Sequence, residues 1–360
     1  PLPDMRVDLN FARSIAFSYQ EFFRYDNNVS SATYGKFRSF AETETGNFSM
    51  TVITLRSAFE KIDPEKGNSK FFETFMDNRY SISQRLAIQD GNFNTDTTGF
   101  FDGYGKYSQQ VLIPAFLAAY TGKSANNVNL NPFPKIPLPN WRINYSGLIK
   151  IPIVAEYFTS FVINHSYTST YNVNSFNRPT TTAERYISNN NYVPDYEIQQ
   201  ITVSETFGPL IGFDMTLKNK ININLDYKQS RNLGLSFANA RLEQMNTQEY
   251  NVGIAYTTNN LKLPFSIGNG QKVLTNDLNV RMDFNIRLNR GVVHRMDQNY
   301  SEIINGSRVL SIKPSVEYVL NQRFQVRVFY DRLVTNPFIT TSFPTKITSL
   351  GFSLRINIGA

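Results

Sequence analysis

Residues 277–288 alternate strictly between polar and apolar side chains, and this period of two constrains the fold more than any other feature. The even positions form one apolar set: Leu278, Val280, Met282, Phe284, Ile286 and Leu288. The odd positions form one polar set: Asp277, Asn279, Arg281, Asp283, Asn285 and Arg287. Successive side chains of a strand face opposite sides of a sheet, whereas a helix would spread these charges around its surface. The segment therefore predicts a strand with one apolar and one polar face.

The same alternation recurs along the chain. It is clear in 6–11, 221–228, 324–331 and 350–358, and weaker in 141–145, 161–173, 233–237 and 252–256. The polar positions of 324–331 include Arg327 and Asp331. The pattern predicts about a dozen strands, many near the 9–11 residues that a tilted membrane-spanning strand needs.

Polar segments separate these predicted strands. Short connections are predicted at 218–220, 230–232 and 320–322, and longer polar loops at 289–307 and 334–345. An alternation of tight turns and long loops is typical of outer-membrane β-barrels. A soluble antiparallel sandwich also alternates, and it remains the competing fold.

Composition favours the barrel. Aromatic residues make up 14% of the chain and charged residues 18%, below the roughly 25% charged residues usual in soluble domains. No run approaches the roughly 18 apolar residues of a membrane helix. We predict an all-β, antiparallel transmembrane barrel, with the apolar set from Leu278 to Ile286 facing lipid. The polar set from Asn279 to Arg287, together with Arg327 and Asp331, would face a wet lumen.

Residues 69–139 do not fit strands and predict an insertion between them. Apolar spacing indicates a short helix over 71–86, a polar loop over 90–107 and an apolar helix over 111–120, which Ser108 would begin and Gly122 would end. Four prolines between Pro132 and Pro139 then impose an extended path. Such an insertion could be a lumen plug, a gate or a docking surface, and a packed loop with no moving part is equally compatible.

The sequence predicts no enzyme. There is no Cys, and the two histidines are far apart: His165 is expected to be a packed ring within a strand, and His294 a solvated side chain in a polar loop. No residues have the spacing of catalytic, cofactor-binding or metal sites. The net charge is +7 but scattered, so no nucleic-acid partner is expected.

Three segments carry a family resemblance: 104–122, 133–142 and 336–344 with the strand that follows; 210–233 is also similar. The most distinctive residues in them are Leu112, Pro114, Phe116, Tyr120, Pro137, Pro139, Trp141, Pro337 and Phe338. The chain resembles the C-terminal part of the giant outer-membrane translocon barrels of the Bacteroidetes type IX secretion system, the SprA/Sov family.

The resemblance implies that residues 1–360 supply the C-terminal arc of a very large barrel, whose N-terminal part lies elsewhere. Such a barrel exports folded cargo proteins with C-terminal signals to the cell surface and also supports gliding motility. The implied partners are outer-membrane lipid, a PorV-like smaller barrel and a periplasmic plug protein. An outer-membrane porin or nutrient transporter is the alternative, followed by an outer-membrane enzyme and a soluble surface adhesin.

Overall fold

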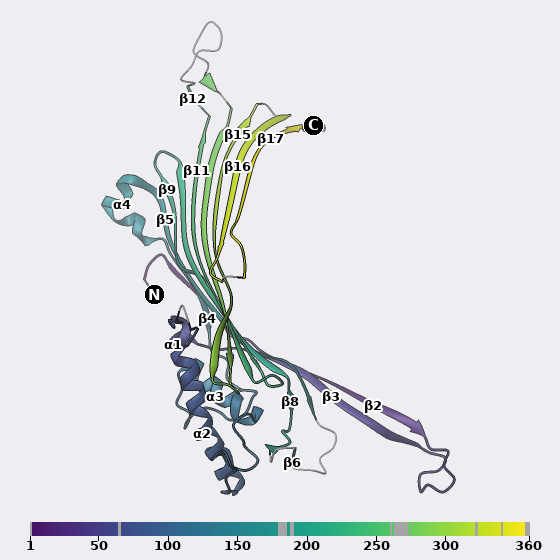
Figure 1. The fold of residues 1–360 in the computed structure, drawn as a ribbon. Coiled ribbons are helices and arrows are strands. Elements are labelled where there is room, and N and C mark those ends of the chain that lie inside the picture. Colours follow the sequence, from purple (N-terminus) through teal and green to yellow (C-terminus); the bar gives the residue numbers. More distant parts are fainter. Residues whose placement is uncertain are drawn as a thin grey trace.

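In the computed structural model, the described part of the chain covers residues 2–356 except 64–65, 179–185, 188–190, 260, 263–272, 275, 321–322 and 340. It is dominated by one antiparallel sheet of 13 strands within these residues, which confirms the predicted all-β class. The sheet is long, twisted and open (Figure 1). Its main path follows β1, β4, β5, β9, β10, β11, β14, β15, β16 and β17.

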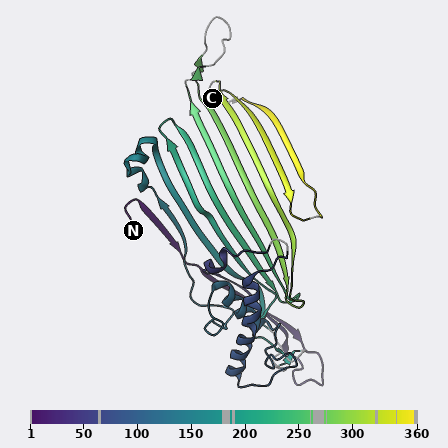
Figure 2. The same cartoon turned by 60° about the vertical axis from the view of Figure 1, so that its left-hand side comes forward.

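Consecutive antiparallel strands form the C-terminal half of the sheet, lying side by side in Figure 2. They are β9 (Gln200–Leu217), β10 (Ile221–Ser236), β11 (Arg241–Thr258), β14 (Leu278–Arg295), β15 (Tyr300–Val319), β16 (Phe324–Pro337) and β17 (Thr345–Ile356). The short strands β12 (Leu261–Lys262) and β13 (Val273–Leu274) pair beyond the end of β11. The predicted turn at 218–220 is confirmed, with Lys220 in the left-handed region at φ 67°.

Two predicted connections are wrong. Residues 230–232 lie inside β10, and most of the predicted loop 289–307 is strand, because β14 continues to Arg295 and β15 begins at Tyr300. The predicted loop 334–345 is shortened to the residues between Pro337 and Thr345. The strands of 16–20 residues from β9 to β15 exceed a spanning length, and only one part of each has the clear alternation. Residues 321–322 of the third short connection lie outside the described residues.

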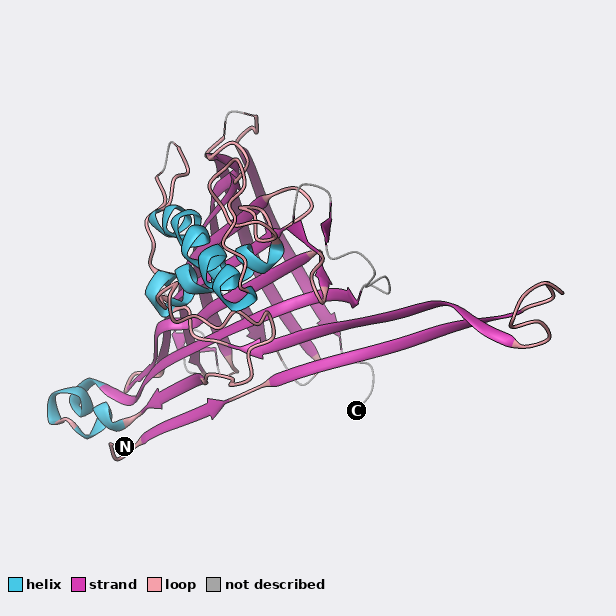
Figure 3. Ribbon diagram, turned by 90° about the horizontal axis from the view of Figure 1, so that it is seen from below, coloured by secondary structure: helices cyan, strands magenta, loops and turns pink. Residues whose placement is uncertain are grey.

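The N-terminal edge is built from strands that are distant in sequence. β1 (Met5–Asn10) pairs with β4 (Asn140–Tyr145), which pairs with β5 (Phe158–Arg178). β2 (Arg13–Tyr25) and β3 (Phe37–Thr51) form a hairpin that joins the lower part of β5 through β3 and then projects well beyond the sheet (Figures 1 and 3). The short strands β6 (Tyr186–Ile187), β7 (Asn191–Tyr192) and β8 (Glu197–Ile198) follow β5.

The insertion between β3 and β4 occupies residues 52–139 and is larger than predicted. It contains α1 (Leu55–Ala58), α2 (Lys70–Asp90) and α3 (Gln109–Thr121). Both predicted helices are confirmed, although α2 is longer than expected. At the start of α2 the Ser69 hydroxyl accepts a hydrogen bond from the Phe72 amide. Gly122 ends α3 in the left-handed conformation at φ 71°. The segment 52–63, which precedes the predicted start at residue 69, also lies between β3 and β4 and contacts the sheet through Ser57 and Ala58.

The insertion covers one face of the lower sheet, and the main core lies between them (Figure 3). Every residue of α3 from Val111 to Tyr120 is buried, as expected for a helix that is apolar on all sides. Phe133 of the proline-rich segment contacts Phe48 and Phe176 with ring centroids 5.4 and 4.9 Å apart. A 3₁₀ turn, Gly147–Lys150, and α4 (Pro152–Tyr157) connect β4 to β5 and were not predicted. Among the described helices, none has the length and apolar character needed to cross a membrane.

Candidate functional site

The predicted polar side chains lie together on one face of the sheet, which we call the polar face. Strand register places Asn279 beside Glu317, and Glu317 beside Arg327. The residues Arg281, Asp283, Asn285 and Arg287 share this face by alternation, as does Asp331 of β16. The sequence thus predicted the grouping correctly; the assignment of these side chains to a lumen stays a prediction.

Hydrogen bonds join side chains across the polar face. The Arg287 guanidinium lies 2.8 Å from a carboxylate oxygen of Glu249, and the Asn285 amide donates to the same carboxylate at 3.0 Å. Farther along the face, Asp214 accepts hydrogen bonds from Asn164 at 2.5 Å and Asn224 at 2.6 Å. Arg287 and Asp214 are exposed and the other four residues are partly buried, so the polar face is a solvent-accessible surface whose charges partly pair with one another.

The opposite face carries an exposed apolar band. Leu278, Val280, Met282, Phe284 and Ile286 lie on it, and register continues the band through the apolar residues of β10 and β11. Val280 remains 37% exposed and Met282 44%. The stretch 278–288 rises about 33 Å along the strand, or about 25 Å for strands tilted near 40°. That height matches the apolar belt of outer-membrane barrels; the contact with lipid stays a prediction.

Below the band, polar side chains enter the same face beside buried core residues, and the insertion covers it. Tyr227 and Leu288 are the last residues of the band, followed by Gln229 and Arg290 two positions farther along their strands. The Gln229 amide donates to the Ala58 carbonyl at 2.7 Å. The insertion therefore lies on the face opposite to the predicted lumen side chains. A lumen plug and a lumen lined by these polar side chains are thus mutually exclusive predictions.

A buried ion pair anchors the insertion to the sheet. Glu205 of β9 and Arg231 of β10 lie 2.8 Å apart and are almost fully buried. The Glu205 carboxylate also accepts hydrogen bonds from the Thr54 hydroxyl at 2.6 Å and the Tyr167 hydroxyl at 2.8 Å. Arg231 donates to the Ser57 hydroxyl at 2.8 Å and to its carbonyl. We call these five residues the anchor network.

Sequence reasoning missed the anchor network. A usable signal exists in the alternation itself, because Glu205 is in phase with Val203 and Phe207, and Arg231 with Leu233. Single charges of opposite sign at neighbouring positions of an apolar face indicate a buried pair more often than an isolated charge.

Glu60 lies close to this network in the insertion. It accepts a hydrogen bond from the Phe71 amide at 2.7 Å, and burial raises the pKa of its carboxyl above the usual value. Its second oxygen, the Tyr120 hydroxyl and Nε of Arg231 are buried atoms with no hydrogen-bond partner among the described residues. Glu60 and Arg231 attract each other electrostatically. The Glu60 carboxylate therefore adds to the negative charge that Glu205 places beside Arg231.

The prediction for His165 is confirmed, and the prediction for His294 is wrong. His165 is a partly buried ring whose Nδ1 lies 2.6 Å from the Leu210 carbonyl, which confirms the expected packed ring. His294 was predicted to be solvated and is instead fully buried in β14. Its ring stacks on Phe72 of α2 at 4.4 Å, and its Nδ1 lies 2.7 Å from the Ser301 hydroxyl. The prediction failed because the strand continues past the point where its alternating pattern is clear.

Acid should weaken the packing around His294. Burial lowers the pKa of His294 from 6.5 to about 4. The contribution of the neutral ring to the free energy of unfolding is therefore fully present above pH 6.5, and it falls by about 1.4 kcal/mol per pH unit as the pH drops toward 4. Between pH 7 and 5 we expect a loss of about 2 kcal/mol that His294→Phe does not show. Urea unfolding of both proteins at the two pH values measures it. Equal losses in the two proteins would contradict this role for His294.

The residues that carry the family resemblance lie in α3, at the start of β4 and at the end of β16. Leu112, Pro114, Phe116 and Tyr120 are buried in α3. Pro137 and Pro139 lead into β4, where Trp141 stacks on Tyr167 with ring centroids 4.5 Å apart. Pro337 ends β16, and Phe338 follows it, 5.7 Å from the Arg290 guanidinium. The structure thus brings the first two segments together at the insertion and keeps the third at the C-terminal strands.

Among the described residues, no group of three or more His, Asp or Glu side chains could hold a metal ion. The features that remain are two surfaces, the polar face and the apolar band, and the insertion anchored below them. No protein-family model matches the chain, and a search of curated proteins finds no match either.

Proposed function

We propose that this chain forms one arc of a transmembrane β-barrel in a bacterial outer membrane, and that the barrel conducts folded cargo proteins to the cell surface. The observation that carries the membrane assignment is the exposed apolar band, about 25 Å high, backed by a charged, hydrogen-bonded polar face. Lipid would cover the first surface, and a hydrated lumen would lie against the second.

The open edges of the sheet support a larger assembly. In the described residues, β1 pairs only with β4, and β17 only with β16. A sheet in a bilayer cannot leave strand edges unpaired, because the hydrocarbon offers no hydrogen-bond partners. Further strands, the N-terminal part of the same barrel, would therefore pair with these edges. The ten strands of the main path set a lower limit on the size of the closed barrel. The choice of a protein-conducting channel over an ordinary porin or nutrient transporter rests on the family resemblance.

The family resemblance supports the remaining steps of the proposal. It supplies the type IX secretion role, the support of gliding motility, the cargo with C-terminal signals, the PorV-like barrel and the periplasmic plug protein. These partners would engage a channel that has no catalytic task.

Single-particle imaging of the detergent-purified assembly, with mass spectrometry of the copurifying proteins, tests the proposal. We expect a large closed barrel in which this chain supplies one arc, with a smaller barrel beside it. A small barrel closed by this chain alone would favour a porin or transporter instead, and a soluble particle would exclude the membrane assignment.

A further inference from the structure

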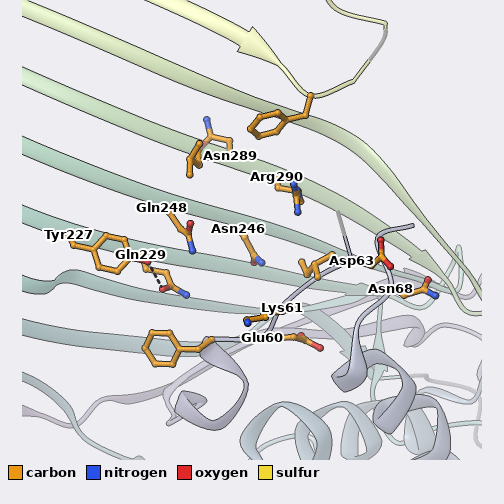
Figure 4. A pocket seen from close by; sticks show the side chains of 14 residues that line it. Glu60, Lys61, Asp63, Asn68, Tyr227, Gln229, Asn246, Gln248, Asn289 and Arg290 are labelled. Carbon is orange, nitrogen blue, oxygen red and sulfur yellow. Dashed lines mark hydrogen bonds between the residues drawn. The ribbon is translucent and has the colours of Figure 1, made fainter. Parts of the chain in front are cut away.

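A cavity of about 800 Å³ lies between the insertion and the sheet, directly below the apolar band (Figure 4). Its volume is within the range of small-molecule sites. One wall is the segment 59–63 with Asn68, and the other comes from β10, β11 and β14. Tyr227 and Leu288, the last residues of the apolar band, line it at the end nearer the band. The cavity therefore joins an exposed apolar surface to a polar recess.

Two cationic side chains line the polar part of the cavity. Arg290 packs its guanidinium against the Phe338 ring, and Lys61 is exposed on the insertion side. Neither forms an ion pair within the part of the chain that the structure describes. Guanidinium and ammonium groups are the preferred ligands of phosphate oxygens.

The two acidic residues of the cavity wall accept hydrogen bonds from backbone amides of the insertion. Glu60 accepts a hydrogen bond from the Phe71 amide at 2.7 Å, and Asp63 accepts one from the Lys66 amide at 2.9 Å. The side-chain amides of Asn246, Gln248 and Asn68 complete the polar lining. The second Glu60 oxygen is a buried atom without a hydrogen-bond partner among the described residues, so it is not presented to a ligand. The groups that the recess offers to a ligand are the two cations and the neutral amides.

From this arrangement we propose that the cavity binds a phospholipid with an anionic headgroup, whose phosphate contacts Arg290 and Lys61 while its acyl chains follow the apolar band upward. The site would be at the depth where lipid headgroups meet the barrel wall, and this inference rests on the proposed membrane function. Tyr227 and Tyr250, stacked at 4.7 Å, would flank the acyl chains, as aromatic residues do at membrane interfaces.

Lipid retention by the detergent-purified assembly tests this site. The assembly is equilibrated with micelles containing dioleoylphosphatidylglycerol and washed, and the lipid left per chain is measured by mass spectrometry. We expect Arg290→Gln with Lys61→Gln to lower retention at least about tenfold. The matched control, Arg281→Gln with Arg327→Gln, removes two charges from the polar face and should retain the lipid.

Comparison ligands distinguish the sources of the phosphate. Dioleoylglycerol, which lacks the headgroup, should be retained poorly by all proteins. Displacement of the phospholipid by millimolar inorganic phosphate would assign the site to free phosphate and overturn the proposal, as would equal retention in both double variants. If the assembly resists urea extraction from membranes yet retains no phospholipid, only the lipid site fails; an assembly that never enters membranes would refute the proposed function itself.

Discussion

Glu205→Ala should destabilise the chain by about 3–5 kcal/mol, because it leaves the Arg231 charge buried without its partner. Glu205 also accepts hydrogen bonds from Thr54 and Tyr167, so the variant removes the acceptor that joins the insertion to two strands. We expect the insertion 52–139 to become sensitive to limited proteolysis before the sheet does. The urea midpoint of the detergent-solubilised assembly measures the loss in stability.

Two further variants separate charge burial from general damage. Replacing the pair together, as Glu205→Ala with Arg231→Met, should cost less than Glu205→Ala alone, because no unpaired buried charge remains. Glu249→Ala breaks the more exposed pair with Arg287 and should cost only about 0–1 kcal/mol. If Glu205→Ala were digested no faster than Glu249→Ala, the anchor network would not hold the insertion in place.

Phe284→Arg should impair membrane insertion by about 2–4 kcal/mol, since residue 284 lies near the middle of the apolar band. The matched variant Asn285→Arg puts the same charge on the polar face, close to Glu249, and should insert normally. Both proteins would be expressed in the outer membrane, and the fraction resisting urea extraction would be compared with wild type.

The two substitutions differ by one position, so backbone propensity and added charge are closely matched. Equal insertion of Phe284→Arg and Asn285→Arg would show that the apolar band does not face lipid. Impaired insertion of Asn285→Arg alone would reverse the assignment of the two faces.

Strand location was predictable wherever the two faces of a strand meet different surroundings. In 278–288 one face is apolar and the other charged, and the alternation predicted this part of β14 correctly. It predicted only a short part of the neighbouring β11 and did not identify β15. Past Leu288 the apolar face is covered by protein, which accepts Arg290, His294 and other polar groups when they find partners. The period of two is then weakened, and those strand ends were predicted to be loops.

The insertion was predictable only in part for a related reason. α2 and α3 have helical spacing and terminal glycines, which the sequence displays directly. Residues 52–63 have neither, and their position depends on long-range hydrogen bonds such as that from Arg231 to Ser57. Contacts of this kind join segments far apart in the chain, so no local pattern reveals them. The polar and apolar faces were predictable, and the anchor network was not.

The pairing of β1 with β4 sets the order in which the sheet can form. Met5 pairs with Tyr145 across the whole insertion, whereas β9, β10, β14, β15 and β16 each pair with the next strand along the chain. Non-local pairing is slow, because a long segment must be ordered before its ends meet. We therefore expect the C-terminal hairpins to assemble early and β1 to add last. During that interval the outer edge of β4 would be the exposed template for intermolecular pairing, and a chaperone that delays aggregation would act there.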